Sequence, residues 1–287
     1  MKILVPVDFS GNSGHAAEQA ILWAEDSGSE LKFCYVSQVL TPTGSITYGV
    51  PVETQAEHLE SRENDLKKMI EPLLEKHKVS NRVKYSYIAV NNAVNSDGIV
   101  QLANEWNADM IVMGNKGESN VATKIFGSTT TSVLDKSEIP VCTIPTGSLR
   151  SNWKKIGIGT DLITVERDIV KNANVLGKLA VDFDLIYVHP VFPEKVSMDS
   201  FSPEKLCSEL HNQTGFAFHW TPIKTEKEND ISGGIDSYIE EKDPDVLIMF
   251  YTRRNWFEKL IDTSMTKSMI LSNKVAVLSI KRNPKIA

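Results

Sequence analysis

Three glycines in the first half of the sequence have the spacing of a loop that binds phosphate groups. Gly114 and Gly117 are separated by two residues, and nine residues separate Gly117 from Gly127. The first two glycines would let the backbone approach a phosphate chain, and Gly127 would permit a tight turn into a helix. That helix would begin with three hydroxyl residues, Ser128, Thr129 and Thr130. Their free N–H groups, their hydroxyls and the helix dipole suit an anion, so the segment predicts phosphate binding without a catalytic base.

A carboxylate stands at the end of the first expected strand. The apolar run 3–7 ends at Asp8, and a polar cluster at 10–13 follows it, as in a buried strand that leads into a capped helix. A parallel sheet places its site at the carboxyl ends of its strands. Two other expected strands end at Val36 and at Met113-Gly114. Taken alone, Asp8 could be an ordinary helix-start residue and each glycine a turn residue, but together these positions favour one ligand site.

Alternating strands and helices would position these residues. The sequence predicts strands at 3–7, 31–36, 83–89, 110–113 and 141–144. It predicts helices at 16–24, 52–77, 93–106 and 128–136. Strands that alternate with helices need crossover connections, so we expect a parallel sheet that is covered on both faces.

The pattern then begins a second time. Four later segments repeat strands of the first half: 155–161, 185–189, 245–249 and 275–280. A chain of 287 residues also exceeds the usual size of one domain. We therefore expect two similar α/β domains, 1–146 and 153–287, joined by a polar, turn-rich linker at 145–152.

Composition limits the partners and the compartment. The formal net charge is -6, which provides no general attraction for a polyanion, so we expect no nucleic-acid partner. Cys34, Cys142 and Cys207 are too few and too scattered for a disulfide framework and favour a reducing compartment. No uninterrupted apolar stretch approaches the length of a membrane span or of a signal-peptide core. We expect a soluble cytoplasmic protein without a membrane partner.

The glycine pattern and the first strand together resemble a known family. G-x2-G-x9-G-[ST] follows a strand ending at 111–113, and the chain opens with Ile-Leu-Val-Pro-Val-Asp at 3–8. This combination resembles the ATP-binding branch of the universal stress protein family, in its tandem form. The resemblance covers the first half almost completely and the second half more loosely. It implies two doubly wound domains with five-stranded parallel sheets and flavodoxin-like layering, a bound adenine nucleotide, and a regulatory role in the stress response.

The resemblance also implies roles for individual residues of the first domain. Asp8 would contact the ribose, Pro6 and Val36 the adenine, and Met113 the nucleoside. The cofactor would be ATP or another adenine nucleotide, accompanied by Mg²⁺. The phosphates would be held by the glycines and hydroxyls of the loop and helix, namely Gly114, Gly117, Gly127, Ser128, Thr129 and Thr130.

The second half departs from this pattern. Aligning Met249 with Met113 gives three replacements: Phe250 for Gly114, Arg253 for Gly117, and Thr263 for Gly127. Three other counterparts are kept, namely Asp161, Val188 and Ser264. The replacing side chains would enter the space of the phosphates, so we expect a degenerate domain without a triphosphate site and one nucleotide per chain. Arg253 and Arg254 could attract another anion or simply be solvated surface.

A second function class remains open from the sequence. Residues 232–237 read SGGIDS, the pyrophosphate-binding motif of ATP pyrophosphatases, which predicts an enzyme that adenylates its substrate. That motif normally follows a buried strand, whereas here it follows the charged stretch 224–230, so a helix start is the simpler interpretation. The other enzymatic alternative is slow ATP hydrolysis in the first domain. Glu118 and Asp135 are the nearest acids to its glycines, and neither is clearly placed to orient water, so we expect no catalytic residues.

Two further expectations concern metals and assembly. Cys207 and His211 are four apart in an expected helix and could share a metal, but two ligands do not make a site, so we expect none. His189 lies near Asp161 in the alignment, where a different ligand is conceivable. The apolar last strands, 141–144 and 275–278, need cover. We therefore expect the two domains to pair as a pseudo-dimer, with homodimerisation of the chain left open and the regulatory protein partner unidentified.

Overall fold

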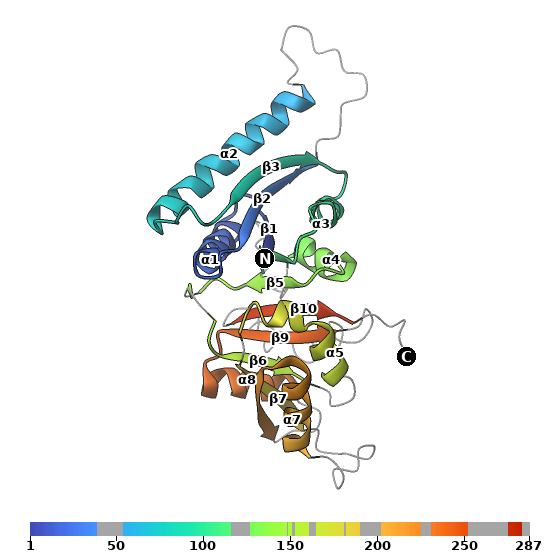
Figure 1. Cartoon of the computed structure of the whole chain (residues 1–287). Coiled ribbons are helices and arrows are strands. Elements are labelled where there is room, and N and C mark those ends of the chain that lie inside the picture. Colours follow the sequence, from blue (N-terminus) through green and yellow to red (C-terminus); the bar gives the residue numbers. More distant parts are fainter. Residues whose placement is uncertain are drawn as a thin grey trace. The chain divides into compact units, whose positions relative to one another are not determined.

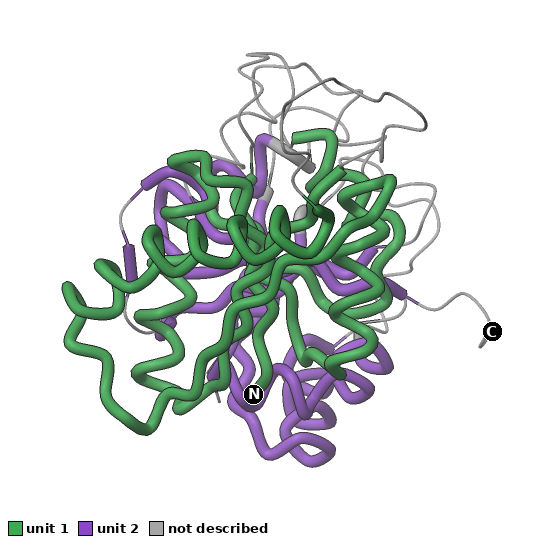
Figure 2. Tube along the Cα trace, turned by 90° about the horizontal axis from the view of Figure 1, so that it is seen from above, with its two compact units in different colours: residues 1–122, 126–144 green, residues 123–125, 145–287 purple. Residues whose placement is uncertain are grey.

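The structure of the protein is a computed structural model that describes most of the chain. The described residues are 1–38, 54–115, 127–147, 149–150, 153–160, 165–180, 182–189, 202–224, 231–251 and 275–282. The chain forms two compact units, which divide between Ile144 and Pro145 and are coloured separately in Figure 2. This division falls at the start of the segment 145–152, in which the sequence predicts a linker.

Unit 1 is a parallel sheet with the strand order β3-β2-β1-β4-β5 (Figure 1). Its strands are β1 (Lys2–Pro6), β2 (Glu30–Ser37), β3 (Tyr85–Asn91), β4 (Met110–Gly114) and β5 (Val141–Ile144). Its helices are α1 (Gly11–Ser27), α2 (Gln55–Lys76), α3 (Asn95–Glu105) and α4 (Ser128–Lys136). Helix α1 packs with α2, and α3 packs with α4, so a helical layer covers each face of the sheet.

Unit 2 has the same topology. Its strands are β6 (Ile156–Gly159), β7 (Asp182–His189), β8 (Ala217–Lys224), β9 (Val246–Tyr251) and β10 (Ala276–Lys281), and its order is β10-β9-β6-β7-β8. Its helices are α5 (Val165–Lys171), α6 (Ala173–Leu176), α7 (Pro203–Thr214) and α8 (Ile231–Lys242). Numbered within each unit, both sheets have the order 3-2-1-4-5 and all their described pairings are parallel. The prediction of two doubly wound, five-stranded parallel sheets is confirmed.

The strand register aligns the two units residue by residue. Ile3 of β1 pairs with Met110 of β4, and Ile156 of β6 pairs with Val246 of β9. Since Ile156 corresponds to Ile3 in the sequence repeat, Val246 corresponds to Met110. Counting along the strands then places Phe250 at the position of Gly114, in agreement with the alignment made from the sequence.

The same pair of hydrogen bonds joins the first and fourth strands of each unit. In unit 1, Asp109 accepts the Lys2 N–H at 2.7 Å and returns its own N–H to the Lys2 carbonyl at 2.8 Å. In unit 2, Asp245 accepts the Lys155 N–H at 2.9 Å and returns its N–H to the Lys155 carbonyl at 2.8 Å. This reciprocal aspartate clasp fixes where the first strand begins against the fourth.

Local capping explains where the longest helices begin and end. The Ser10 side chain accepts the Ser13 N–H, so α1 starts at Gly11, before the apolar stripe that predicted it. Its C-cap is Gly28, whose φ of 67° favours a residue without a Cβ. Helix α2 begins after a capping box formed by Thr54 and Glu57, so its first residue, Gln55, lies three residues inside the predicted range.

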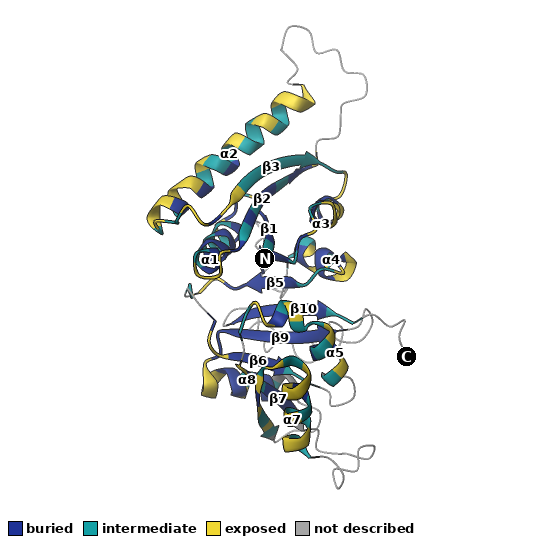
Figure 3. Cartoon of the chain, in the orientation of Figure 1, coloured by how far each residue is buried: buried dark blue, intermediate teal, exposed yellow. Residues whose placement is uncertain are grey.

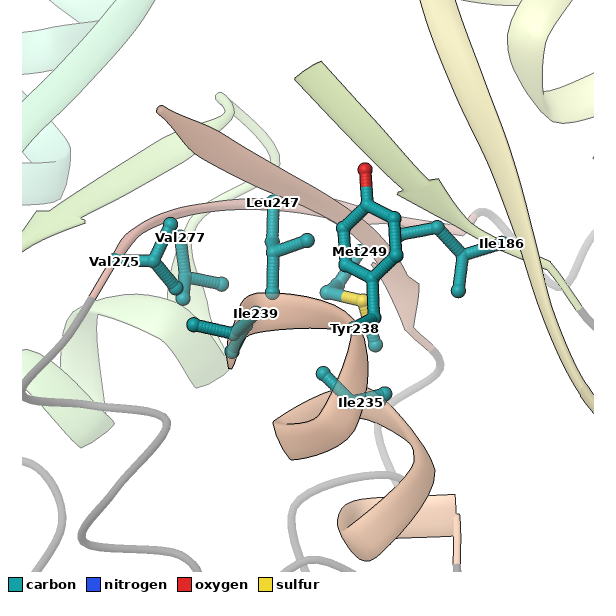
Figure 4. Close-up of a cluster of buried hydrophobic side chains, with 8 residues drawn as sticks. All are labelled: Ile186, Ile235, Tyr238, Ile239, Leu247, Met249, Val275 and Val277. Atoms are coloured by element: carbon teal, nitrogen blue, oxygen red, sulfur yellow. The ribbon is translucent and has the colours of Figure 1, made fainter. Parts of the chain in front are cut away.

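The hydrophobic core of each unit lies between its sheet and its helices, as Figure 3 shows. In unit 2, eight buried side chains form one cluster between α8 and the sheet (Figure 4). They are Ile186, Ile235, Tyr238, Ile239, Leu247, Met249, Val275 and Val277. The Tyr238 hydroxyl donates to Asp184 Oδ2 at 2.9 Å, so the polar end of this ring is bonded. Among the described helices, none is both long enough and apolar enough to cross a membrane.

Candidate functional site

A cavity of about 290 Å³ opens in unit 1 at the carboxyl ends of β1, β2 and β4. Strand order reverses between β1 and β4, which is where doubly wound sheets bind their ligands. Nine of the ten residues that the sequence analysis selects line this cavity: Pro6, Asp8, Val36, Met113, Gly114, Gly127, Ser128, Thr129 and Thr130. The tenth, Gly117, lies outside the described residues.

The cavity also has walls that sequence reasoning missed. They are formed by Val7, Ser13, Cys34, Tyr35, Asn95 and Ile99. Asn95 and Ile99 come from the first turns of α3, four residues apart and therefore on one helical face. The available signal was their position after β3, at the same edge of the sheet as Asp8. The Cys34 thiol is fully buried, which raises its pKa to about 12 and keeps it neutral.

The Asp8 carboxylate is oriented by the turn that follows it. Ser10 donates its N–H to Asp8 Oδ1 at 3.1 Å and its hydroxyl to the same oxygen at 2.6 Å. Between them, Phe9 has a φ of 63°, a rare backbone conformation for a bulky residue, and its ring centroid lies 5.0 Å from that of Tyr35. Both bonds fall on Oδ1, so within the described part of the chain the second carboxylate oxygen keeps its lone pairs for a ligand.

The backbone of Val36 extends past the end of the neighbouring strand. Leu31 donates its N–H towards β3, so the even-numbered residues of β2 turn their backbone groups to β1. Pairing with β1 ends at Pro6 and Cys34, followed by one bond from the Val7 N–H to the Cys34 carbonyl at 2.8 Å. Val36 therefore presents one N–H donor and one C=O acceptor beyond β1, in the wall of the cavity.

Both ends of the glycine segment are held in place. The Gly127 N–H donates to the Asn115 carbonyl at 2.8 Å, and the Thr130 hydroxyl donates to the Gly114 carbonyl at 3.1 Å. A Cβ on Gly114 would lie 2.9 Å from the Asn12 carbonyl oxygen, so a larger residue would displace the backbone there. Residues 116–126, which include Gly117 and Glu118, are outside the described part of the chain.

The first turn of α4 points its N-terminal end into the cavity. Its N-cap is Gly127, which offers no side-chain hydrogen bond, and its first turn contains no acidic residue. Ser128, Thr129 and Thr130 of this turn all line the cavity. An uncapped helix start with three hydroxyls concentrates N–H donors and the positive end of the helix dipole, which together suit an anion.

The described part of the corresponding place in unit 2 differs from unit 1. Phe250, at the position of Gly114, is 6% exposed. It also borders a different cavity, of about 30 Å³, which is lined by α5 and the end of β10. Beside it, Arg282 Nε donates to Asp168 Oδ2 at 2.6 Å. Where unit 1 has the 17-residue helix α1, unit 2 has the 7-residue α5 and the 4-residue α6. The other residues compared from sequence lie outside the described ranges, namely Asp161, Arg253, Arg254, Thr263 and Ser264. The side chain of Val188 is not described.

Two sequence motifs of unit 2 have ordinary structural surroundings. The SGGIDS segment, 232–237, lies within helix α8, whereas a pyrophosphate loop would precede a helix. His211, four residues after Cys207 in α7, bonds through Nδ1 to the Phe216 carbonyl at 2.9 Å. Within the described ranges, no group of three His, Cys, Asp or Glu residues could hold a metal ion. The side chain of His189 is not described.

Comparison with known proteins gives consistent matches. The model of the universal stress protein family matches residues 1–145. A universal stress protein from Archaeoglobus fulgidus DSM 4304 superposes with a TM-score of 0.65 and 17% identity, covering 99% of this chain and 97% of that chain. A putative universal stress protein from Pseudomonas aeruginosa UCBPP-PA14 gives 0.61 and 15%, covering 98% and 92%. At these identities the two structures show the fold alone. No curated protein matches the chain.

Proposed function

The chain belongs to the universal stress protein family, and we propose that it is a regulatory protein whose unit 1 binds an adenine nucleotide, ATP with Mg²⁺. One observation carries this proposal: a single cavity contains a backbone donor–acceptor pair, an oriented carboxylate and an uncapped helix start. These three groups match the three parts of a nucleotide. Unit 2 has the same topology but a phenylalanine at the decisive glycine, so we propose one nucleotide per chain.

The base and the sugar would occupy the end of the cavity near β1 and β2. The Val36 carbonyl can accept from the exocyclic amine of adenine while the Val36 N–H donates to the neighbouring ring nitrogen. Apolar side chains around this position, such as Pro6 and Ile99, can cover the faces of the ring. The unbonded oxygen of Asp8 can accept from the ribose hydroxyls.

The phosphates would lie at the start of α4. Backbone N–H groups and the hydroxyls of Ser128 and Thr129 supply donors, and the absence of a Cβ at Gly114 keeps the approach open. These hydroxyls also fit Mg²⁺, a cation that prefers oxygen ligands and is commonly shared with phosphate oxygens. When bound, the ion would neutralise the charge of the triphosphate.

A regulatory role fits the residues better than catalysis does. Asp8 is the one carboxylate among the described residues that line the cavity, and one of its oxygens is already bonded twice by Ser10. Asp135, one of the two acids nearest to the glycines, does not line the cavity, and Glu118 is outside the described residues. We therefore propose that the nucleotide state alters a surface read by a protein partner, with slow hydrolysis or SGGIDS-dependent adenylation as the alternative.

The family resemblance also supports a proposal on assembly. We propose that the two units associate as a pseudo-dimer within the chain, in a reducing cytoplasm where its three cysteines stay free. Separately expressed halves, mixed in solution, should form a complex that elutes as one species. Two monodisperse halves that fail to associate would contradict the pseudo-dimer.

The proposed nucleotide function is tested with the full chain. Mass spectrometry of the small molecules released from the purified protein should detect an adenine nucleotide. Titration calorimetry with ATP and Mg²⁺ should give a stoichiometry near one. Release of phosphate, pyrophosphate and adenylate from ATP is then followed over time. Sustained multiple turnover would favour the enzyme alternative, and a stoichiometry near two would show that unit 2 also binds.

A further inference from the structure

An asparagine in the cavity wall has a buried amide oxygen without a hydrogen-bond partner among the described residues. Asn95 lines the cavity from the first turn of α3. Its Oδ1 atom is buried, and it has no hydrogen-bond partner among the described residues. A buried amide oxygen without a donor is costly, and an amide can make up to four hydrogen bonds. Such a group at a ligand cavity points to a partner that the ligand supplies.

The surrounding structure holds Asn95 in place. Immediately before it, the Val94 N–H donates to Asn92 Oδ1 at 3.0 Å. Immediately after it, Lys136 of α4 donates to Ser96 Oγ at 3.1 Å and to Asp97 Oδ1 at 2.5 Å. Contacts on both sides therefore fix the helix turn that carries the amide, which reduces the entropy that the side chain would lose on binding.

The remaining edge of adenine matches a side-chain amide. If the Val36 backbone takes the ring nitrogen N1 and one N6 hydrogen, the second N6 hydrogen and the N7 acceptor remain. An asparagine accepts from N6 and donates to N7 in one bidentate contact. Guanine presents two acceptors, O6 and N7, on that edge, so one amide cannot bond both. The N6/N7 edge therefore allows one amide side chain to distinguish adenine from guanine.

We propose that Asn95 reads the N6/N7 edge of the bound base and makes the cavity of unit 1 selective for adenine. The proposal rests on the proposed nucleotide site and adds to it a side chain that recognises the base. Unit 2 lacks this group, because aligning Gly98-Ile99 with Gly234-Ile235 puts Ile231 at the position of Asn95. Unit 2 therefore lacks both the asparagine proposed to recognise the base and the glycine proposed to lie beside the phosphates, which Phe250 replaces.

The test compares ATP with 7-deaza-ATP, which lacks only the N7 acceptor. Titration calorimetry on the full-length chain with Mg²⁺ should show ATP binding about tenfold more tightly than 7-deaza-ATP, as one lost hydrogen bond implies. Asn95→Leu, which keeps the size of the side chain, removes the hydrogen bonds to both N6 and N7. ATP affinity should therefore fall by more than tenfold, and ATP and 7-deaza-ATP should bind this variant equally. Asn104→Leu is the matched control, because Asn104 is exposed on the same helix and does not line the cavity.

The outcomes separate this proposal from the proposed function. If the parent chain binds neither nucleotide, the nucleotide function itself fails. If it binds both equally, or if Asn95→Leu keeps the preference for ATP, the function stands and the role of Asn95 is overturned. Asn95→Ala provides a second variant should the leucine disturb folding, which a thermal melt detects. The ratio of the affinities for ATP and 7-deaza-ATP can be measured on the parent chain alone, so this part of the test does not depend on any variant.

Discussion

The two units share a backbone plan and differ at the edge where a ligand would bind. Both have the strand order 3-2-1-4-5, the same register of first against fourth strand, and the same aspartate clasp. Unit 1 ends β4 in Gly114, which lines a cavity of about 290 Å³, and unit 2 has the buried Phe250 at the same position of β9. The two units therefore share the fold and differ at the fourth-strand residue that, in unit 1, lines the candidate site.

Exchanging the decisive residue should have the largest effect on this difference. Gly114→Phe introduces the residue of unit 2, and its Cβ alone would lie 2.9 Å from the Asn12 carbonyl oxygen. We expect ATP binding to be lost, with a destabilisation of about 1–3 kcal/mol from overpacking. Titration calorimetry measures the binding and urea denaturation the stability.

The control for that exchange is made in unit 2. Phe250→Leu changes the matching position without touching the cavity of unit 1 and should leave ATP binding intact. Gly117→Val, chosen from the sequence because a Cβ would crowd the phosphates, should abolish binding as well. Normal ATP affinity in Gly114→Phe would show that the nucleotide lies elsewhere.

Removing the clasp should destabilise unit 2 more than unit 1. Asp245 accepts the N–H groups of Lys154 and Lys155, at 2.8 and 2.9 Å, and also bonds Arg150. Asp245→Ala leaves these donors without their acceptor and should cost about 3 kcal/mol of unfolding free energy. Asp109→Ala, the matched change in unit 1, should cost less, and urea unfolding of both variants compares them.

The clasp in unit 2 should also depend on pH. Burial acts to raise the pKa of Asp245, but the N–H groups of Lys155 and Lys154 and the Arg150 guanidinium bring it below its usual range. A carboxylate whose folded pKa is lowered stabilises above its unfolded pKa, and that contribution is lost as pH falls through the folded value. Urea unfolding from pH 7 down to about 3 should show this loss in the parent. Asp245→Ala should lack this part of the acid sensitivity, and an unchanged pH profile would contradict the assignment.

Removing the ribose contact should have an intermediate effect. Asp8→Ala removes a charged hydrogen-bond acceptor and should weaken ATP binding by about 1.5–3 kcal/mol, without much change in stability. Ser10→Ala, which removes the hydroxyl that donates to Asp8 Oδ1, should weaken binding less because the Ser10 N–H remains. Calorimetry on the two variants shows which one loses more ATP affinity. Equal ATP affinities for Asp8→Ala and the parent would show that Asp8 is not part of the site.

The smallest effect is expected at the position in unit 2 that aligns with Gly117. Arg253→Ala should leave ATP binding nearly unchanged, because the proposed nucleotide is held by unit 1. A clear loss of affinity in the full chain would show that this residue contributes to the site.

The sequence predicted most of the fold because buried parallel strands form continuous apolar runs. Strand β5 and helix α4 coincide with their predicted ranges. Strand β8 was not identified individually, because its sequence AFHWTPIK includes Pro222 and the exposed His219, as an edge strand permits. Polar first turns hid the start of α1, which only the Ser10 cap reveals.

Within the site, residues near the glycine and aspartate motifs could be selected from sequence, whereas the α3 wall could not. Asn95 and Ile99 reach the cavity through a crossover from β3, so their nearness to Asp8 depends on tertiary structure. Likewise, the backbone groups of Val36 become available because β1 ends two residues too early to pair with them. Neither property is encoded in a short motif.

The aspartate clasp also has a consequence for the order in which the protein folds. It joins residues 107 positions apart in unit 1, whereas β1 and β2 are neighbours in the chain. Closing so long a loop costs more entropy than pairing consecutive strands and slows the step. We therefore expect the β1–β4 contact to form late, and the cavity, which lies where these two strands meet, to be completed with it. A ribosome-bound chain that has emerged only through β3 has Asp8 and Val36 but no assembled cavity.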